Sequence, residues 1–189
     1  AADLVRTDPK YQHIIDNLLG RIIVVEDLTE ASAVARSLGY RNRIVTLDLN
    51  GYVLKYDSAD QGSVIVVEGG GNLTLTDSND KKVHKFDKSV MPWALAADDA
   101  VGENIADVSG GVITGGTGTD LSTYGGTTWY CGGGALIKNG GSLTMRGGNI
   151  IGCSAECGGG VCVDSESNQS PFSMSGGSII GCVASDIGG

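Results

Sequence analysis

Several features are scarce in this 189-residue sequence, and each scarcity excludes a class of protein. Only three prolines are present, so no proline-rich linker separates its parts. No run approaches the roughly 18 apolar residues that a membrane-spanning helix needs. Aromatic residues make up only 5%, but 41% of residues are hydrophobic, which excludes a disordered acidic tail despite the net charge of -9. No basic-then-apolar leader follows Ala1, so no targeting signal is visible and we expect a fragment.

Glycine, by contrast, is abundant and unevenly placed. The chain has 31 glycines, well above the ~7% typical of globular proteins, and they lack the three-residue period of collagen. Only Gly20 and Gly39 precede residue 49. The first 48 residues carry six cations and seven anions, whereas the remaining 141 carry seven cations and 15 anions. This shift in composition predicts two unlike units, residues 1–48 and 49–189.

The first unit has the pattern of a small α/β segment. Asp8 and Pro9 start a helix whose apolar residues recur at helical spacing up to a Gly20 cap. Asp27 opens a second helix that Gly39 closes. β-branched runs predict the strands before, between and after these helices, at residues 3–5, 22–25 and 43–47. The predicted order is therefore β-α-β-α-β.

These segments carry a resemblance to a known family. The relevant stretches are Ala2–Val5, Asp8–Tyr11, Leu18–Arg21, Val24–Leu28, Ala35–Arg41 and Arg43–Asp48. Together they resemble the second half of the hinge of bacterial SMC (structural maintenance of chromosomes) proteins, which condense chromosomes. The resemblance implies a non-catalytic dimerisation module in the cytoplasmic nucleoid, with a second hinge as its partner and weak contact with DNA.

The sequence departs from the hinge pattern in ways that limit this function. The first half of the hinge is missing, and Leu49–Tyr52 stands where the family has a Gly-Asp step and a Pro-Gly-Gly segment. We therefore do not expect the ring-shaped hinge dimer. The candidate DNA contacts are cations interleaved with anions, a pattern that favours solvated surfaces over a basic stripe. These cations are Arg6, Lys10, Arg41 and Arg43.

The second unit reads as short strands separated by glycine pairs. The strands are expected at 52–56, 63–67, 72–76, 111–114, 135–137, 142–145 and 161–163. Internal repeats relate them. Met145–Cys153 recurs 29 residues later as Met174–Cys182, and Cys131–Ala135 recurs 26 residues later as Cys157–Val161. Val108–Gly115 is a weaker copy of the first repeat, and Gly69–Leu75 parallels Asn139–Met145.

A period of this length is typical of one coil of a parallel β-helix. The sequence therefore predicts a mainly β protein, an incomplete right-handed parallel β-helix with an irregular insertion around 77–107. Its glycine pairs would occupy sharp corners. Residues 47–189 resemble Gly-Gly-rich surface proteins of Gram-positive gut bacteria. That resemblance implies an extracellular or cell-surface adhesive or structural role, with proteins or glycans as ligands. The two resemblances meet at Leu47-Asp48, which indicates a chimeric join, natural or artefactual.

The cysteines occupy equivalent positions in successive repeats. Cys131 and Cys157 form one pair and Cys153 and Cys182 another, which leaves Cys162 over. Stacking brings equivalent Cα atoms to about 5 Å, within the disulfide window. Two disulfides and two stacks of buried free thiols both remain open. Zinc at Cys153, Cys157 and Cys162 is disfavoured because no Cys-x-x-Cys motif occurs.

No pattern points to catalysis or to a cofactor, so we expect a non-enzyme without either. The aspartates are explained by turn chemistry, although calcium binding is an alternative for Asp77, Asp80, Asp98, Asp99 and Asp107. Arg146 is the one arginine after Arg43, which leaves few of the cations that β-helix polysaccharide enzymes use. Two interpretations remain open for Tyr124, Trp129 and Tyr130: a patch that stacks on carbohydrate, or a packed loop cluster.

Overall fold

The computed structural model describes residues 44–121, 128–164 and 171–187. The chain divides into two units, Ala1–Tyr40 and Arg41–Gly189, and all described residues belong to the second. Within them we find strands and turns but no helix, which confirms the mainly β class for this part of the chain. Accordingly, none of these residues forms a helix that could cross a membrane. Both helices expected before residue 40 lie outside the described ranges.

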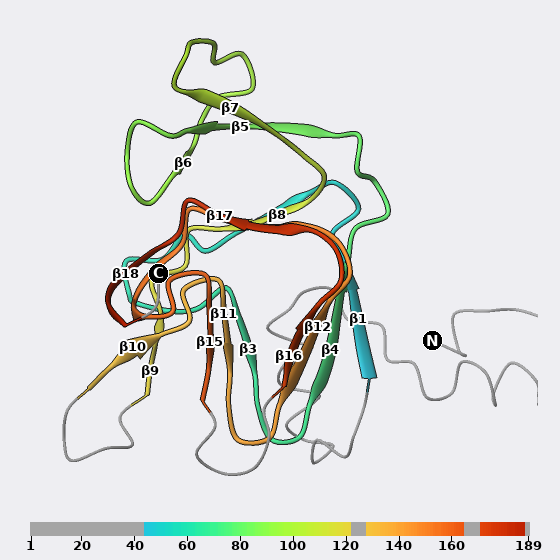
Figure 1. The fold of residues 1–189 in the computed structure, drawn as a ribbon, viewed down its shortest axis with the longest axis vertical. Helices are drawn as coiled ribbons and strands as arrows, with labels where there is room; N and C mark the ends of the chain where they lie inside the picture. The colour runs from blue at the N-terminus through green and yellow to red at the C-terminus, as the bar shows by residue number, and fades with distance from the viewer. Residues whose placement is uncertain (1–43, 122–127, 165–170, 188–189) are drawn as a thin grey trace, which may run out of the picture. The chain divides into compact units, whose positions relative to one another are not determined.

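Four sheets bring together strands that are far apart in the sequence (Figure 1). The first sheet contains β1 (Ile44–Asp48), β4 (Asn72–Thr76), β12 (Ser142–Met145) and β16 (Phe172–Met174). The second contains β2 (Val53–Lys55), β8 (Val112–Thr114), β13 (Asn149–Ile151) and β17 (Ser178–Ile180). The third contains β3 (Ile65–Val67), β11 (Ala135–Ile137) and β15 (Val161–Val163). All neighbouring strands in these three sheets are parallel.

The fourth sheet is mixed. It contains β9 (Thr119–Asp120), β10 (Tyr130–Cys131), β14 (Ser154–Cys157) and β18 (Val183–Ile187). Its strands are parallel except for the antiparallel pair β9 and β10. The chain therefore visits the sheets in a recurring order, in four passes that span 44–67, 72–137, 142–163 and 172–187.

A separate antiparallel sheet interrupts the second pass. It contains β5 (Val83–Asp87), β6 (Ala94–Leu95) and β7 (Ile105–Ser109), with β5 in the centre. It lies to one side of the stacked strands, at the top of Figure 1. These strands fall in and just beyond the region where the sequence predicts an insertion.

All seven strands expected between residues 52 and 163 are present, and the predicted repeat registers are confirmed. Met145 pairs with Met174, and Ile150 pairs with Ile179, as the 29-residue repeat requires. Cys131 pairs with Cys157, as the 26-residue repeat requires. The two weaker copies are also in register, since β8 pairs with β13 and β4 pairs with β12.

The core is aliphatic, as the scarcity of aromatic residues requires. Alternation along the strands turns Leu143 and Met145 inward and leaves Ser142 and Thr144 on the outer face. β13 is instead buried on both faces, because the antiparallel sheet covers its outer side: Ile150 packs in the main core, and Ile151 packs in a second cluster. This second cluster contains Phe86, Val108, Val112 and Ile151, with Val53 and Trp93 against it.

Glycine corners turn the chain from one sheet to the next. Gly152 (φ 63°) and Gly181 (φ 59°) occupy the same place in successive passes, directly after β13 and β17. Positive φ is costly for residues with a Cβ, so these positions favour glycine. The backbone of the antiparallel insertion approaches the same corners, and the Trp93 N–H donates a hydrogen bond to the Gly181 carbonyl at 2.9 Å.

Candidate functional site

The outer face of the first sheet carries a ladder of hydroxyl groups. Thr46 on β1, Thr74 on β4 and Thr144 on β12 occupy one register row, which Ser173 on β16 continues. They line up because the parallel strands are in register and alternate residues share a face. In the sequence the ladder is visible as a threonine, or Ser173 in the last strand, between two apolar residues, a pattern from which it was predictable.

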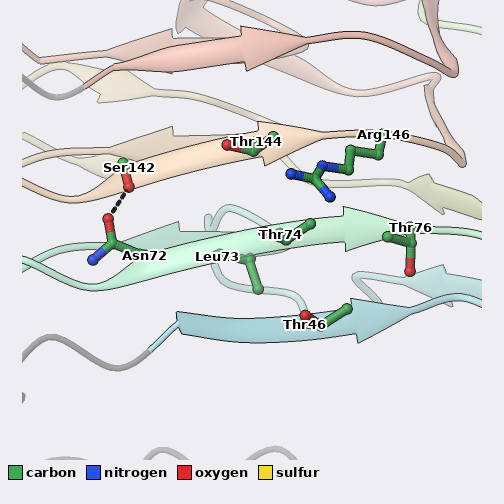
Figure 2. Close-up of a pocket in the computed structure, with 8 residues that line it drawn as sticks. All are labelled: Thr46, Asn72, Leu73, Thr74, Thr76, Ser142, Thr144 and Arg146. Atoms are coloured by element: carbon green, nitrogen blue, oxygen red, sulfur yellow. Dashed lines mark hydrogen bonds between the residues drawn. The ribbon is translucent and has the colours of Figure 1, made fainter.

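This face is hollowed into a shallow groove of about 510 Å³ (Figure 2). Asn72 and Ser142 join the two central strands at one end through a hydrogen bond from the Ser142 hydroxyl to the Asn72 side-chain oxygen. The groove contains no carboxylate among its lining residues, so its polarity comes from hydroxyl, amide and guanidinium groups. The lining residues are Thr46, Asn72, Leu73, Thr74, Thr76, Ser142, Thr144 and Arg146.

Arg146 is the cation of the groove. Its backbone N–H is fixed by the Leu75 carbonyl at 2.8 Å, directly after β12, and its guanidinium lies over the space between β12 and β4 in Figure 2. None of the three ion pairs found among the described residues involves it. Its side chain is exposed, so the guanidinium is available to an anion from solution.

A carboxylate lies in the same region of the sheet but is engaged elsewhere. Asp48 ends β1 and pairs in register with Thr76 on β4. The Ser78 side chain, the Ser78 N–H and the Asn50 N–H donate hydrogen bonds to it, and together they lower the pKa of Asp48. Asp48 is therefore ionised and accepts hydrogen bonds from the turns that follow β1 and β4, and the ion pairs found among the described residues do not join it to Arg146.

The five cysteines are free thiols and form two groups. In the first group, Cys153 and Cys182 follow the equivalent corner glycines Gly152 and Gly181. The Cys153 thiol donates to the Ile151 carbonyl at 3.7 Å, and the Cys182 thiol donates to the Ile180 carbonyl at 3.5 Å. Interaction between the two thiols lowers the pKa of Cys182 to about 7 and, together with burial, raises the pKa of Cys153.

The second group includes Cys162, the cysteine for which the sequence repeats predict no equivalent position. Cys131, Cys157 and Cys162 line one pocket of about 250 Å³, together with Trp129 and other mainly apolar residues. Burial raises the pKa of Cys131 and of Cys162. The three cysteines of the zinc alternative are thus divided between the two groups, and no metal-binding cluster of His, Cys, Asp or Glu occurs among the described residues.

The aspartates weighed for calcium binding are dispersed. Both carboxylate oxygens of Asp77 accept backbone N–H groups, one from Gly51 and one from Gly111, each at 2.7 Å. Asp107 pairs with Lys85 at 2.6 Å. The other three, Asp80, Asp98 and Asp99, are exposed. Asp77 therefore serves as a brace between two corners of the stack, which turn chemistry alone does not predict.

Only some of the residues predicted to stack on carbohydrate or to contact DNA lie in the part of the chain that the structure describes. Trp129 lines the cysteine pocket, whereas Tyr130 begins β10 and is not among the residues lining that pocket. Their proposed stacking companion, Tyr124, lies outside the described residues. The candidate DNA contacts Arg6, Lys10, Arg41 and Arg43 also lie outside them.

Comparison with known proteins bears on the N-terminal segment. Residues 1–35 match the flexible hinge domain of SMC proteins, which supports the hinge resemblance. The Chromosome partition protein Smc of Bacillus subtilis (strain 168) is 50% identical over 48 residues. The protein of the same name from Desulfitobacterium hafniense (strain Y51) is 46% identical over 48 residues. Each match covers 25% of this chain and 4% of the relative's length. No solved structure matches the chain.

Proposed function

We propose that residues 44–187 belong to an incomplete right-handed parallel β-helix with a non-catalytic role at a surface, adhesive or structural. The proposal is supported by parallel strands that recur in register over four passes, around a continuous aliphatic core. The groove on the first sheet has no carboxylate among its lining residues, whereas glycoside hydrolysis ordinarily needs a pair of them. Binding without bond cleavage is the function that suits this face.

The ligand class is inferred from the unpaired Arg146, which lies beside the hydroxyl ladder. Threonine and serine hydroxyls donate and accept hydrogen bonds, so a row of them suits a polyhydroxylated chain. A guanidinium recognises a carboxylate through two parallel N–H donors. The ligand class that combines both features is an acidic glycan, bound along the groove between β4 and β12.

Replacing Arg146 by Gln is expected to weaken binding of polygalacturonate five- to tenfold. Loss of one charge-assisted contact at an exposed site corresponds to about 1–1.4 kcal/mol. Binding would be measured by calorimetry at low salt, where exposed charges are least screened. Lys88→Gln is the matched control, since it removes an exposed cation from the antiparallel insertion and should leave affinity unchanged. Equal loss in both variants, or no binding by the parent chain, would contradict the proposal.

A second candidate function rests on the N-terminal match. We propose as the alternative that the chain is a fragment of a chromosome condensation or segregation protein, acting through hinge dimerisation and weak DNA contact. The match of residues 1–35 to the SMC hinge domain supports it. The two functions make different demands, because the glycan groove lies entirely in residues 46–146 and needs no second chain.

Sedimentation equilibrium separates the alternatives. If the hinge segment dimerises, the full chain should show a concentration-dependent increase toward twice its mass of 19.3 kDa. A chain beginning at residue 44 keeps every strand described above and should remain monomeric. A monomeric full chain at all concentrations would remove the hinge function and leave the glycan proposal untouched.

A further inference from the structure

The two groups of cysteines differ in chemical character. Cys131 is buried, and burial raises its pKa, so its thiol is held in the unreactive protonated form. Cys182 is only half-buried, its thiol donates to the Ile180 carbonyl at 3.5 Å, and interaction with the neighbouring Cys153 thiol lowers its pKa. Thiol reactivity depends on access and on thiolate character, and both favour Cys182.

The backbone places Cys153 and Cys182 directly above one another. The strands on either side of them are in register, since Ile151 pairs with Ile180 and Ser154 pairs with Val183. The Val183 N–H also donates to the Cys153 carbonyl at 2.9 Å, which ties the two corners together. Stacked positions in neighbouring strands are about 4.8 Å apart, and disulfides span Cα separations of about 4.4–6.8 Å. The Cα spacing expected for the pair therefore lies within the disulfide range.

The two thiols are asymmetric in access. Cys153 is fully buried in the main core, whereas Cys182 lies at the edge of that core. Each sits opposite a glycine of a neighbouring corner, since a Cβ built on Gly134 would lie 3.5 Å from Cys153 Sγ and one on Gly160 would lie 3.5 Å from Cys182 Sγ. An accessible thiol backed by a buried one is the arrangement needed for attack followed by resolution.

We propose that Cys182 and Cys153 form a thiol–disulfide exchange site for low-molecular-weight disulfides, with Cys182 as the nucleophile and Cys153 as the resolving thiol. The Cys182 thiolate attacks one sulfur of the small disulfide, forms a mixed disulfide and releases the first small thiolate. The Cys153 sulfur then attacks the Cys182 sulfur, and its proton passes to the departing small thiolate, which leaves as the second small thiol. Two protein thiols are oxidised to one disulfide, and the small disulfide is reduced to two thiols.

The physical chemistry of the pair sets the expected rate. A lowered pKa increases the ionised fraction of the Cys182 thiol at pH 7. The intrinsic nucleophilicity of a thiolate falls with its pKa, which offsets part of this gain. The net expectation is exchange at Cys182 faster than at the cysteines of the unfolded chain.

The test uses oxidised glutathione on the reduced full chain at pH 7, with acid quenching and peptide mapping by mass spectrometry. The parent chain should form the Cys153–Cys182 disulfide and retain no glutathione. Cys153→Ala, which keeps a small apolar side chain in the core, should trap one glutathione on Cys182. Cys182→Ser should form neither product at this site, and Cys131→Ser is the matched control that should behave like the parent chain.

Three results would overturn the assignment. One is glutathione retained on Cys182 in the parent chain, because resolution by Cys153 would then be absent. Another is preferential reaction at Cys131, Cys157 or Cys162. The third is exchange at Cys182 no faster than in the urea-unfolded chain, which would make both corner thiols inert core residues. The mapping of the parent chain decides the matter even if a variant folds poorly.

Discussion

Replacing Ile150 by Ala is expected to lower the free energy of unfolding by about 3–4 kcal/mol. Ile150 is fully buried in the main core, where β13 lies between β8 and β17. Its side chain has neighbours in register on both sides, Ile113 and Ile179. Truncation removes the transfer free energy of the deleted groups and leaves a cavity. Because the parallel strands on both sides prevent the cavity from collapsing, the loss of unfolding free energy lies in the upper part of the ~2–5 kcal/mol range for such changes.

Ile179→Ala is the matched control. Ile179 occupies the same register position one pass later but is 38% exposed. Its loss should be about 1 kcal/mol, because much of the side chain already contacts water and little cavity forms. Both values would come from urea unfolding monitored by circular dichroism. Similar losses at the two positions would mean that β17 is covered in solution as fully as β13.

The sequence was sufficient to predict the stacked strands because repetition supplies the long-range information that a single strand lacks. Met145–Cys153 and Met174–Cys182 share their residue order, and two copies of one pattern pack in register because this aligns their inward-facing side chains. The glycine-marked corners follow from the same repeats. The register of Cys131 with Cys157 was predictable for this reason.

Structural features that depend on residues outside the repeats could not be predicted from the repeats. The antiparallel pairing of β5 with β6 and β7 depends on tertiary contacts around Phe86 that have no repeated counterpart. The grouping of Cys162 with Cys131 depends on the corner between β14 and β15, which spacing alone does not determine. Arg146 was visible as an isolated arginine, but its place beside the threonine ladder required the register of three strands.

The segment where the two resemblances meet is structurally part of the stack. β1 was expected to close the α/β segment, yet all five of its residues pair with β4, from Ile44 with Asn72 to Asp48 with Thr76. The hinge-domain model matches residues 1–35, whereas the two Smc relatives match over 48 residues, a length that reaches β1. A hydrophobic strand of alternating pattern can serve either environment, because its pairing is decided by the neighbour that offers a ladder. The shift in amino-acid composition therefore locates the boundary between the two units only approximately.

Replacing Gly152 by Ala is expected to cost about 3–4 kcal/mol, and two separate effects contribute. Gly152 has φ 63°, where a residue with a Cβ is disfavoured by roughly 1–2 kcal/mol. A Cβ at this position would also lie 1.9 Å from the Trp93 carbonyl oxygen, a backbone atom that cannot rotate away. The insertion would have to move outward, and overpacking of this kind typically adds about 1–3 kcal/mol.

Gly69→Ala isolates the first effect from the second. Gly69 has nearly the same backbone conformation, φ 62°, but a Cβ there meets nothing within 4 Å. Its substitution should cost about 1 kcal/mol, so the two variants differ chiefly by the clash with Trp93. Urea unfolding gives both values, and tryptophan emission in a Trp129→Phe background reports on Trp93, which packs against the second core cluster. Gly152→Ala should shift that emission to longer wavelength, whereas equal losses and unchanged emission in both variants would show that the insertion does not seat on this corner.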